Sequence, residues 1–497
     1  MQKKENEIWL LTGSQTLYGE ETLRQVDAHS RVVVDGLNAC GKLPCKVHYL
    51  GTVKSTEEIA ERFRDANASE KCVGVVLWMH TFSPAKMWIR GLKLLQKPML
   101  HLHTQFDVEI PWGEIDMDYM NLNQSAHGDR EFGHIATRLN MPRKVVVGHW
   151  SDPDVQERIA AWTRACSAWS ALNSLRIARF GDQMNNVAVT DGDKVSAEET
   201  FGFRVSYCPV GELAGEIAKT SQSDVDALVA EYESLYEFAD DCKVGGANRG
   251  QVVEAARIEI ALRRVLERWN ADAFTTNFDD LYGLNQLPGL ASQRLMSEGY
   301  GFGAEGDWKT AALVRAMKVA AEGLPGGTSF LEDYVYHFKG KGAILQAHML
   351  EVCPTIAQTK PRIEVHPLGI GGKADPARLV FTAREGAGVA ATIVDLGNRF
   401  RMIVNEVDCV APEADLPKLP VARAFWTPRP DLKTSAAAWI LAGGTHHTSF
   451  SSALTREHLE DFAEIAGIEG VFIDSKTEIS NFRRELRWND AYYSWRR

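Results

Sequence analysis

The chain has 497 residues, 24% of them charged and 45% hydrophobic, a composition typical of soluble globular proteins. At roughly 150 residues per domain, this length predicts about three domains. The formal net charge of -11 argues against a nucleic-acid partner, because phosphates attract clustered Lys and Arg, and it favours a neutral small molecule. No apolar run approaches about 18 residues, so we expect no membrane-spanning helix. The charged start lacks a signal-peptide pattern and predicts a cytoplasmic protein.

The first third alternates short apolar runs with amphipathic stretches, which predicts βαβ units around a parallel sheet. A long helix is expected over residues 153–175, and the run RIARFGD reads as the first strand of a second α/β unit. Helical spacing of apolar residues continues through 223–240 and 250–270. From about residue 328 the chain changes to closely spaced β-rich runs, and Gly397-Asn398 stands where a tight turn would join two of them. We therefore predict three domains, 1–175, 176–327 and 328–497.

The eight cysteines are scattered and form no CxxC pair, so neither a zinc ribbon nor a disulfide framework is expected. Most of these thiols should be buried and reduced. They are Cys40, Cys45, Cys72, Cys166, Cys208, Cys242, Cys353 and Cys409.

The run TSFLEDYVYHF places a carboxylate among aromatic rings. Strand alternation puts Glu332 on the face that also carries Phe330, Tyr334, Tyr336 and Phe338. A buried carboxylate is costly unless it is paired, protonated or bound to a metal. An edge strand with Glu332 at the sheet margin is an equally good interpretation of the spacing.

The run GYGFGAEGDW surrounds Glu305 with glycines, which permit unusual backbone torsions. Asp307 is a plausible N-cap for a helix that begins at Trp308. For a lone glutamate in a loop, solvation is the usual state. A dinucleotide fingerprint is a weaker interpretation, because its spacing is wrong and no preceding strand is clear.

Histidines occur in two further runs. In GAILQAHMLEVCP, alternation puts His348 on one face with Ile344, Gln346 and Leu350, where a hydrogen-bonded core histidine is the commoner case. In LAGGTHHTSF, His446 and His447 are adjacent, and neighbours in an extended segment point to opposite faces. At most one of these two should face a site, and the pattern does not choose between them.

Two glutamates and two histidines within one part of the chain suit a six-coordinate divalent ion. Manganese prefers such a mixed set, although cobalt, iron and zinc also accept imidazole. Positions left open on the ion would suit the adjacent hydroxyl and carbonyl oxygens of a sugar. The residues alone therefore indicate a divalent-metal enzyme that acts on a neutral polyoxygenated substrate.

Several long motifs of the chain closely resemble those of L-arabinose isomerases, and the resemblance covers essentially the whole length. It implies metal-dependent aldose-ketose isomerisation of L-arabinose to L-ribulose, and of D-galactose to D-tagatose, through an enediol intermediate. It also implies one Mn²⁺ per subunit, with Co²⁺ as a substitute, held by Glu305, Glu332, His348 and His447. Glu305 and Glu332 would transfer the proton, and His446 would face away to a structural partner. The motifs are LLTGSQTLYGEE, NLNQSAHGDREFG, GFGAEGDWKTA, TSFLEDYVYHF, HMLEVCPTIA, PRIEVHPLGIGGK, PVARAFWTPRP, AGGTHHTSF and ELRWNDAYY.

The resemblance further implies an α/β fold: two Rossmann-like (flavodoxin-like) domains followed by a β-rich, barrel-like C-terminal domain. It implies a homohexamer, a dimer of trimers, whose active sites lie between subunits and are completed by a neighbour's NLNQSAHGD loop. Thr445 stands where many members carry a small apolar residue, but it is not a ligand position. The substrate contacts implied are Gln15, Leu17, Tyr18, Phe82, Gln124, His127, Met184, Phe278 and Ile370.

Two other classes of protein share some of these features. Two α/β lobes also occur in periplasmic sugar receptors, but the missing signal peptide and the clustered Glu and His residues count against a receptor. A doubly wound dehydrogenase is disfavoured because TGSQTLYG lacks the second and third glycines of the dinucleotide fingerprint.

Overall fold

The computed structural model of the chain describes residues 5–495. Contacts divide the chain into two compact units: one holds the chain up to Ser170 together with Glu460–Gly467, and the other holds Ala171–Leu459 and the chain from Ile468 onward. Within the described range, no helix is both long and apolar enough to cross a membrane. The division into three domains at residues 175 and 327 stays a prediction.

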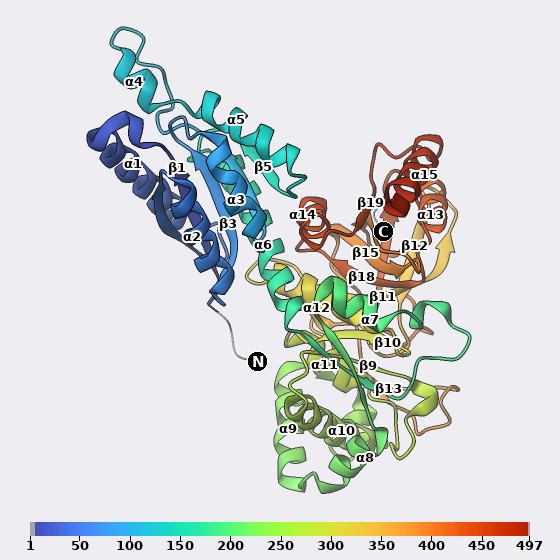
Figure 1. Cartoon of the computed structure of the whole chain (residues 1–497). Coiled ribbons are helices and arrows are strands. Elements are labelled where there is room, and N and C mark those ends of the chain that lie inside the picture. Colours follow the sequence, from blue (N-terminus) through green and yellow to red (C-terminus); the bar gives the residue numbers. More distant parts are fainter. Residues whose placement is uncertain (1–4, 496–497) are drawn as a thin grey trace. The chain divides into compact units, whose positions relative to one another are not determined.

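The first unit is built on a five-stranded parallel sheet with the strand order β2-β1-β3-β4-β5, whose colours run from blue to teal in Figure 1. This is the flavodoxin-like order, in which ligands bind beyond the carboxyl ends of the strands. The strands are β1 (Glu7–Gly13), β2 (Lys46–Val53), β3 (Cys72–Met79), β4 (Met99–His103) and β5 (Lys144–Val147).

Helices cover both faces of this sheet, because successive buried strand residues point to opposite sides. Val33 of α1 and Trp162 of α6 pack in the core on one face, while Phe63 of α2, Trp88 of α3 and Phe132 of α5 pack on the other. The βαβ prediction for this region is confirmed. The helices are α1 (Gly19–Ala39), α2 (Thr56–Ala68), α3 (Trp88–Leu94), α4 (Met117–Leu122), α5 (Ser125–Arg138) and α6 (Pro153–Asn173).

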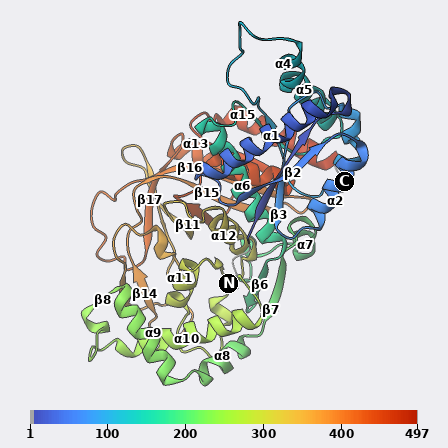
Figure 2. The ribbon, with the colours of Figure 1, turned by 90° about the vertical axis from the view of Figure 1, so that its left-hand side faces the viewer.

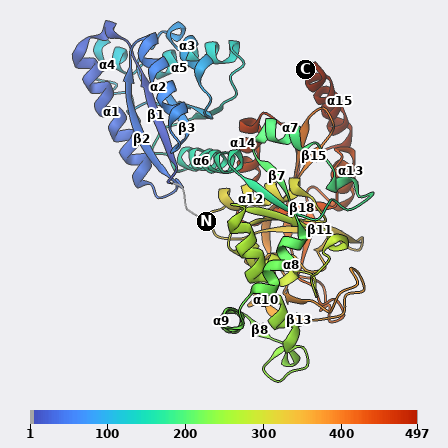
Figure 3. The same cartoon turned by 60° about the horizontal axis from the view of Figure 1, so that its bottom comes forward.

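The second unit begins with a four-stranded parallel sheet in the order β10-β9-β6-β7, which is the flavodoxin-like order cut short by one strand. Figure 3 shows α8 and α10 beside each other in this part, where their apolar faces share one core. The elements are β6 (Arg176–Phe180), α7 (Lys194–Phe201), β7 (Arg204–Cys208), α8 (Val210–Lys219), α9 (Gln222–Leu235), α10 (Arg249–Arg268), β9 (Ala273–Thr276), α11 (Gly289–Ser297), β10 (Gly301–Ala304) and α12 (Trp308–Ala320).

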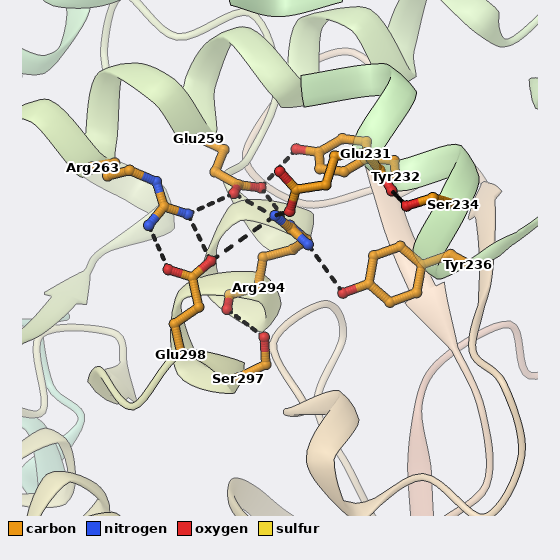
Figure 4. Close-up of polar contacts among 9 residues, drawn as sticks. All are labelled: Glu231, Tyr232, Ser234, Tyr236, Glu259, Arg263, Arg294, Ser297 and Glu298. Carbon is orange, nitrogen blue, oxygen red and sulfur yellow. Dashed lines mark hydrogen bonds and ion pairs between the residues drawn. The ribbon is translucent and has the colours of Figure 1, made fainter. Parts of the chain in front are cut away.

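A buried ion network ties α11 to α9 and α10, and Figure 4 shows its side chains converging. Arg294 of α11 donates through Nε to Glu259 Oε2 at 3.1 Å and through Nη2 to Glu231 Oε1 at 2.6 Å. Glu259 also accepts from Tyr232 Oη at 2.6 Å and from Arg263 Nη2 at 2.9 Å. Buried charges are tolerated when they are paired in this way. The network therefore holds α11 against α9 and α10.

The last part is a closed antiparallel barrel with one extra strand, which confirms the predicted fold class; Figure 2 shows several of its strands. The order is β15-β18-β11-β12-β17-β16-β19, and a further pairing of β15 with β16 closes the ring. Gly397 lies in the turn between β15 and β16, as predicted, and its φ of 78° is one that glycine adopts readily. The strands are β11 (Thr328–His337), β12 (Ala343–Ala347), β15 (Gly386–Asp395), β16 (Phe400–Cys409), β17 (Arg423–Pro428), β18 (His447–Ser451) and β19 (Glu469–Ile473).

Smaller elements complete the second unit. A three-stranded sheet joins β8 (Glu237–Phe238) to β13 (Arg362–Val365) and β14 (Ala377–Val380). The remaining helices are α13 (Leu432–Leu441), α14 (Arg456–Ala466), whose second half belongs to the first unit, and α15 (Ile479–Trp495). Six of the eight cysteines are buried and all eight are free, which confirms their predicted state.

The expected aromatic face of β11 was wrong at two of its residues, Tyr336 and Phe338. The pairing of β11 with β12 slips between Asp333 and Val335, so Tyr336 lies opposite Ile344 and on the face of Asp333, away from Glu332. Such a bulge places two residues against one on the partner strand and reverses the faces beyond it. Phe338 lies past the end of β11 and is 70% exposed. The predicted aromatic face around Glu332 therefore does not extend to Tyr336 and Phe338.

Candidate metal centre

Glu305 lies at the carboxyl end of β10, one residue past the strand, and has the unusual φ of 62° for a residue with a side chain. Its N–H donates to Thr276 O at 2.8 Å, which fixes the turn. Gly303 allows α12 to pack closely, because a Cβ at this position would lie 2.2 Å from Asp307 O. The element directly before this glycine-rich run is the helix α11, and β10 lies within the run itself, so the expectation that no strand precedes it is confirmed. The strained backbone turns Glu305 toward the barrel strands.

Glu332 and His447 occupy directly paired positions on the neighbouring antiparallel strands β11 and β18. Side chains at such positions project to the same face. His447 Nε2 lies 2.9 Å from Glu332 Oε1 and 3.9 Å from Glu305 Oε2. His447 is completely buried and Glu332 is 6% exposed. Strand register alone therefore brings one carboxylate and one imidazole together.

His348 joins them from the segment that follows β12. Its Nε2 lies 3.4 Å from Glu332 Oε1. The expectation that His348 shares a face with Gln346 was wrong, because β12 ends at Ala347 and alternation does not continue beyond it. Gln346 instead donates to Asp333 Oδ1 at 2.5 Å, on the side opposite to Glu332.

The four expected ligands are therefore brought together. Ligand atoms of Glu305, Glu332 and His348 all lie within 4.8 Å of one another, and His447 contacts both carboxylates. The ring of Phe330 packs edge-on against His348 and His447, with centroids 5.1 and 5.3 Å away. This ring excludes water from one side of the cluster.

Two further carboxylates orient the imidazoles from behind, and our sequence analysis missed both roles. Asp307, fully buried, is 2.9 Å through its Oδ2 from His447 Nδ1, and it also caps α12 as predicted. Glu351 contacts His348 Nδ1 in the same way. A carboxylate on the far nitrogen fixes the ring and raises its basicity, an arrangement common behind metal-bound histidines. The i, i+3 spacing of His348 and Glu351 could have indicated from the sequence that Glu351 contacts His348.

The carboxylates have opposite pKa shifts. Burial raises the pKa of Glu305, and the charge of Glu332 adds to this, although His447 opposes it. Burial also works against ionisation of Glu332, but the imidazoles of His348 and His447 hold its pKa at about 2. Glu332 is therefore a carboxylate at neutral pH, and so is Asp307, whose pKa is lowered by Lys309 and His447 against the effect of burial.

The imidazoles are both more basic than usual. Burial lowers the pKa of His348, but Glu351 and Glu332 outweigh it and raise the pKa to about 9. For His447, Asp307 and Glu332 likewise overcome burial and raise the pKa to about 9. The raised pKa values mean that this buried cluster of carboxylates and imidazoles favours the binding of protons. The same negative potential would also favour the binding of a metal cation.

A second observation also indicates that the four side chains could bind a divalent ion. Among the described residues, Glu332 Oε1 and His447 Nε2 are both buried and neither makes a hydrogen bond of normal geometry; they meet only as an ion pair, 2.9 Å apart. Buried polar atoms without a partner are uncommon, and each calls for an explanation. A cation that contacts both Glu332 Oε1 and His447 Nε2 would explain why neither atom makes a normal hydrogen bond.

His446 differs from the expectation that it faces away to a structural partner. It is exposed, and one of its ring nitrogens lies within 4.8 Å of ligand atoms of Glu305 and His447. Because β18 begins only at His447, strand alternation does not fix the direction of the preceding residue. The geometry thus offers a second three-residue group, Glu305, His446 and His447, beside the expected set.

Comparison with known proteins decides the family. Models of the L-arabinose isomerase N-terminal, central and C-terminal domains match residues 2–174, 176–323 and 327–469. The L-arabinose isomerase of Herpetosiphon aurantiacus is 59% identical over 99% of this chain and 98% of its own length. That of Geobacillus kaustophilus is 59% identical over 99% of both chains, and that of Bacteroides thetaiotaomicron is 58% identical over 98% and 97%. The chain belongs to the L-arabinose isomerase family. It is accordingly an enzyme of the aldose-ketose isomerase class.

Three of the sugar contacts expected for this family lie in the same unit as the cluster. The N–H of Met184 donates to Glu305 O at 3.0 Å, so the loop that carries Met184 rests on the Glu305 backbone. Phe278 begins the short helix after β9, and the loop of Ile370 passes close to it: a Cβ at Gly371 would lie 3.7 Å from Phe278 O. Ile370 is 42% exposed. Of these three residues, Met184 is the one with a described hydrogen bond to an expected metal ligand, Glu305.

The other six expected contacts of the isomerase family lie in the first unit, beyond the carboxyl ends of its strands. Tyr18 donates to Gln124 Oε1 at 3.4 Å, and the rings of Phe82 and His127 lie 4.6 Å apart between centroids. Leu17 is 79% exposed. Gln124 is fixed by its N–H, which donates to His80 O at 3.1 Å. The six are Gln15, Leu17, Tyr18, Phe82, Gln124 and His127.

Proposed function

We propose that the enzyme interconverts L-arabinose and L-ribulose, and D-galactose and D-tagatose, with one Mn²⁺ per subunit, for which Co²⁺ can substitute. The observation that carries the proposal is the buried cluster of Glu305, Glu332, His348 and His447 in a chain whose relatives are L-arabinose isomerases. Two carboxylates and two imidazoles form the mixed oxygen and nitrogen set that manganese accepts. The bound ion would supply Lewis-acid stabilisation of negative charge on the two reacting oxygens of the sugar.

The two glutamates are the proposed proton carriers. Isomerisation removes a proton from C2 of the aldose and returns one to C1, while another moves between the two oxygens, so an enediol lies between substrate and product. Glu305 and Glu332 have oxygen atoms within 4.8 Å of each other, close enough to serve adjacent carbons. Glu332 is ionised and can act as a base, and Glu305, whose pKa is raised by burial, is the second carboxyl group beside it.

Asp307, Glu351 and Phe330 have supporting roles in this proposal. Asp307 and Glu351 each hold one nitrogen of an imidazole, so the other nitrogen of His447 and of His348 points into the cluster. Phe330 shields the two rings from water, which strengthens the electrostatic interactions among the charged groups.

The direct test of the proposed substrates is a ketose assay on purified protein supplied with Mn²⁺. L-arabinose is expected to yield L-ribulose and D-galactose to yield D-tagatose, each approaching the same equilibrium from either side. D-glucose and D-xylose serve as control aldoses. Failure to form L-ribulose with manganese present would contradict the proposal.

We also propose a cytoplasmic homohexamer, a dimer of trimers, in which a neighbour's NLNQSAHGD loop completes each active site. Supporting this, the segment before that loop exposes large apolar side chains: Val108 is 73% exposed, Trp112 82% and Met117 65%. Several large apolar groups exposed along one segment are expected where another chain covers the surface. No nucleic-acid or membrane partner is included in the proposal.

Light scattering is expected to report about six chains, and dilution into monomers is expected to abolish activity while the fold persists. Gln124→Ala and His127→Ala should raise KM for L-arabinose, and mixing either one with an inactive Glu332→Gln chain should restore part of the activity in hybrid hexamers. An active monomer, or the absence of any such complementation, would contradict the shared site.

A further inference from the structure

Lys309 is a buried cation that the proposed reaction does not use. It is 3% exposed, and it is the second residue of α12, directly after the helix start that Asp307 caps. Its Nζ donates to Val189 O at 2.7 Å and to Asp191 O, and it lies 3.4 Å from Asp307 Oδ1. The ammonium also lies 4.7 Å from the ring centroid of Trp308. Holding a charged amine in such a place is costly unless it is paired, and here two carbonyl groups accept from it while the carboxylate of Asp307 balances its charge.

The two carbonyl groups belong to the loop that carries Met184. This loop, residues 182–191, is fastened at its start by the bond from Met184 N–H to Glu305 O, and within itself Thr190 Oγ1 donates to Met184 O at 3.2 Å. A Cβ at Gly306 would lie 2.6 Å from Gln183 Cα, so the loop is packed tightly on the turn beyond Glu305. Lys309 fastens its far end. The loop is thus pinned at both ends to the chain segment that supplies Glu305.

Asp307 does not depend on Lys309 for its place. Its carboxylate also accepts from the N–H groups of Lys309 and Thr310 at 3.1 and 3.3 Å and from Thr310 Oγ1 at 2.6 Å. These helix-cap bonds would keep Asp307 against His447 if the ammonium were removed. Loss of the Lys309 side chain should therefore release the loop but leave the metal cluster in place.

We propose that Lys309 is a positioning residue for the sugar: its ammonium clamps the loop of residues 182–191 so that Met184 is held against the substrate. This inference rests on the proposed function, since the sugar contact of Met184 belongs to it. Sugar affinity, rather than metal affinity or the chemical step, is the property that the clamp controls.

The test compares Lys309→Met, which keeps the length and removes all donors, with Lys309→Gln, which keeps two donors without charge. Lys318→Met is the matched control, because Lys318 is a second lysine of α12 with little exposure whose Nζ donates to Thr328 O, outside the loop. In Lys309→Met, hydrogen exchange at the amides of Met184, Thr190 and Asp191 should quicken by about 10- to 100-fold, as expected for lost charged hydrogen bonds. Lys318→Met should leave exchange in this loop unchanged.

Two further readouts separate positioning from general damage. KM for L-arabinose should rise about tenfold in Lys309→Met, with kcat and the Mn²⁺ dissociation constant within about threefold of wild type. Lys309→Gln should recover part of the loop protection and of KM, and it replaces Lys309→Met if that variant does not fold. Unchanged exchange and KM in a folded variant, or parallel loss of Mn²⁺ affinity, would overturn the proposal. Exchange measured on metal-free protein tests the clamp even if the wild type proves not to isomerise L-arabinose.

Discussion

Removal of divalent metal is expected to lower the isomerisation rate by about 10³-fold or more, and Mn²⁺ is expected to restore it, with Co²⁺ as a weaker substitute. The reason lies in the cluster itself: Glu332 Oε1 and His447 Nε2 face each other, buried and without a hydrogen bond of normal geometry in the described chain. Without a cation, protons must balance the carboxylates, as the raised pKa values of His348 and His447 show. The measurement is the initial rate of L-ribulose formation after chelation and after return of each metal.

Two controls make this result decisive. Elemental analysis establishes that the chelated protein is free of metal, and circular dichroism establishes that it remains folded. Mg²⁺ at the same concentration serves as the comparison ion, because it prefers oxygen ligands to imidazole. Full activity of a folded, metal-free preparation would contradict the metal-dependent mechanism.

Replacement of either glutamate by glutamine is expected to lower kcat by about 10²- to 10⁴-fold, because each variant loses one proton carrier. Glutamine keeps the size of Glu305 or Glu332 and one oxygen atom that could contact a cation, so metal content is checked for each variant. Glu413→Gln is the matched control, since this carboxylate is 67% exposed and contacts His337, away from the cluster. It should retain the wild-type kcat.

Deuterium at C2 of L-arabinose follows the hydrogen through the same variants. Partial loss of label to water would establish proton transfer, whereas full retention alone is also compatible with a shielded base that returns the same deuteron. Full retention combined with near-normal kcat in both metal-loaded variants would leave neither Glu305 nor Glu332 a role in proton transfer. That outcome would favour a hydride shift.

Much of the fold followed from local patterns. Apolar runs such as the one before Gly13 alternate with amphipathic helices, and that rhythm allowed a parallel sheet to be predicted before its strand order was visible. Asp307 was identified as a helix cap and Gly397 as a turn residue because both roles depend only on neighbouring residues. Closure of the barrel depends on the pairing of β15 with both β16 and β18. The pairing of β15 with β18 joins segments far apart in the sequence, so no local pattern specifies it.

The candidate site depended more on long-range contacts. Periodicity missed the bulge at Tyr334 and the end of β12 at Ala347, because a single inserted residue or a chain exit leaves no mark on a short apolar pattern. The contact between Asp307 and His447 joins residues 140 positions apart, so spacing could not show it. The four-residue set itself came from family resemblance, while the residue types pointed only to a divalent ion.

The central claim is that His447 is one of the groups that hold the metal, and adjacent His446 provides an internal control, because its ring also approaches Glu305. The most direct measurement is the Mn²⁺ dissociation constant of His447→Asn and His446→Asn, obtained from the signal of free Mn²⁺ in an electron paramagnetic resonance titration. We predict that His447→Asn weakens binding by about 100-fold or more, while His446→Asn stays within about threefold of wild type. Equal losses in both variants, or a larger loss in His446→Asn, would contradict the account.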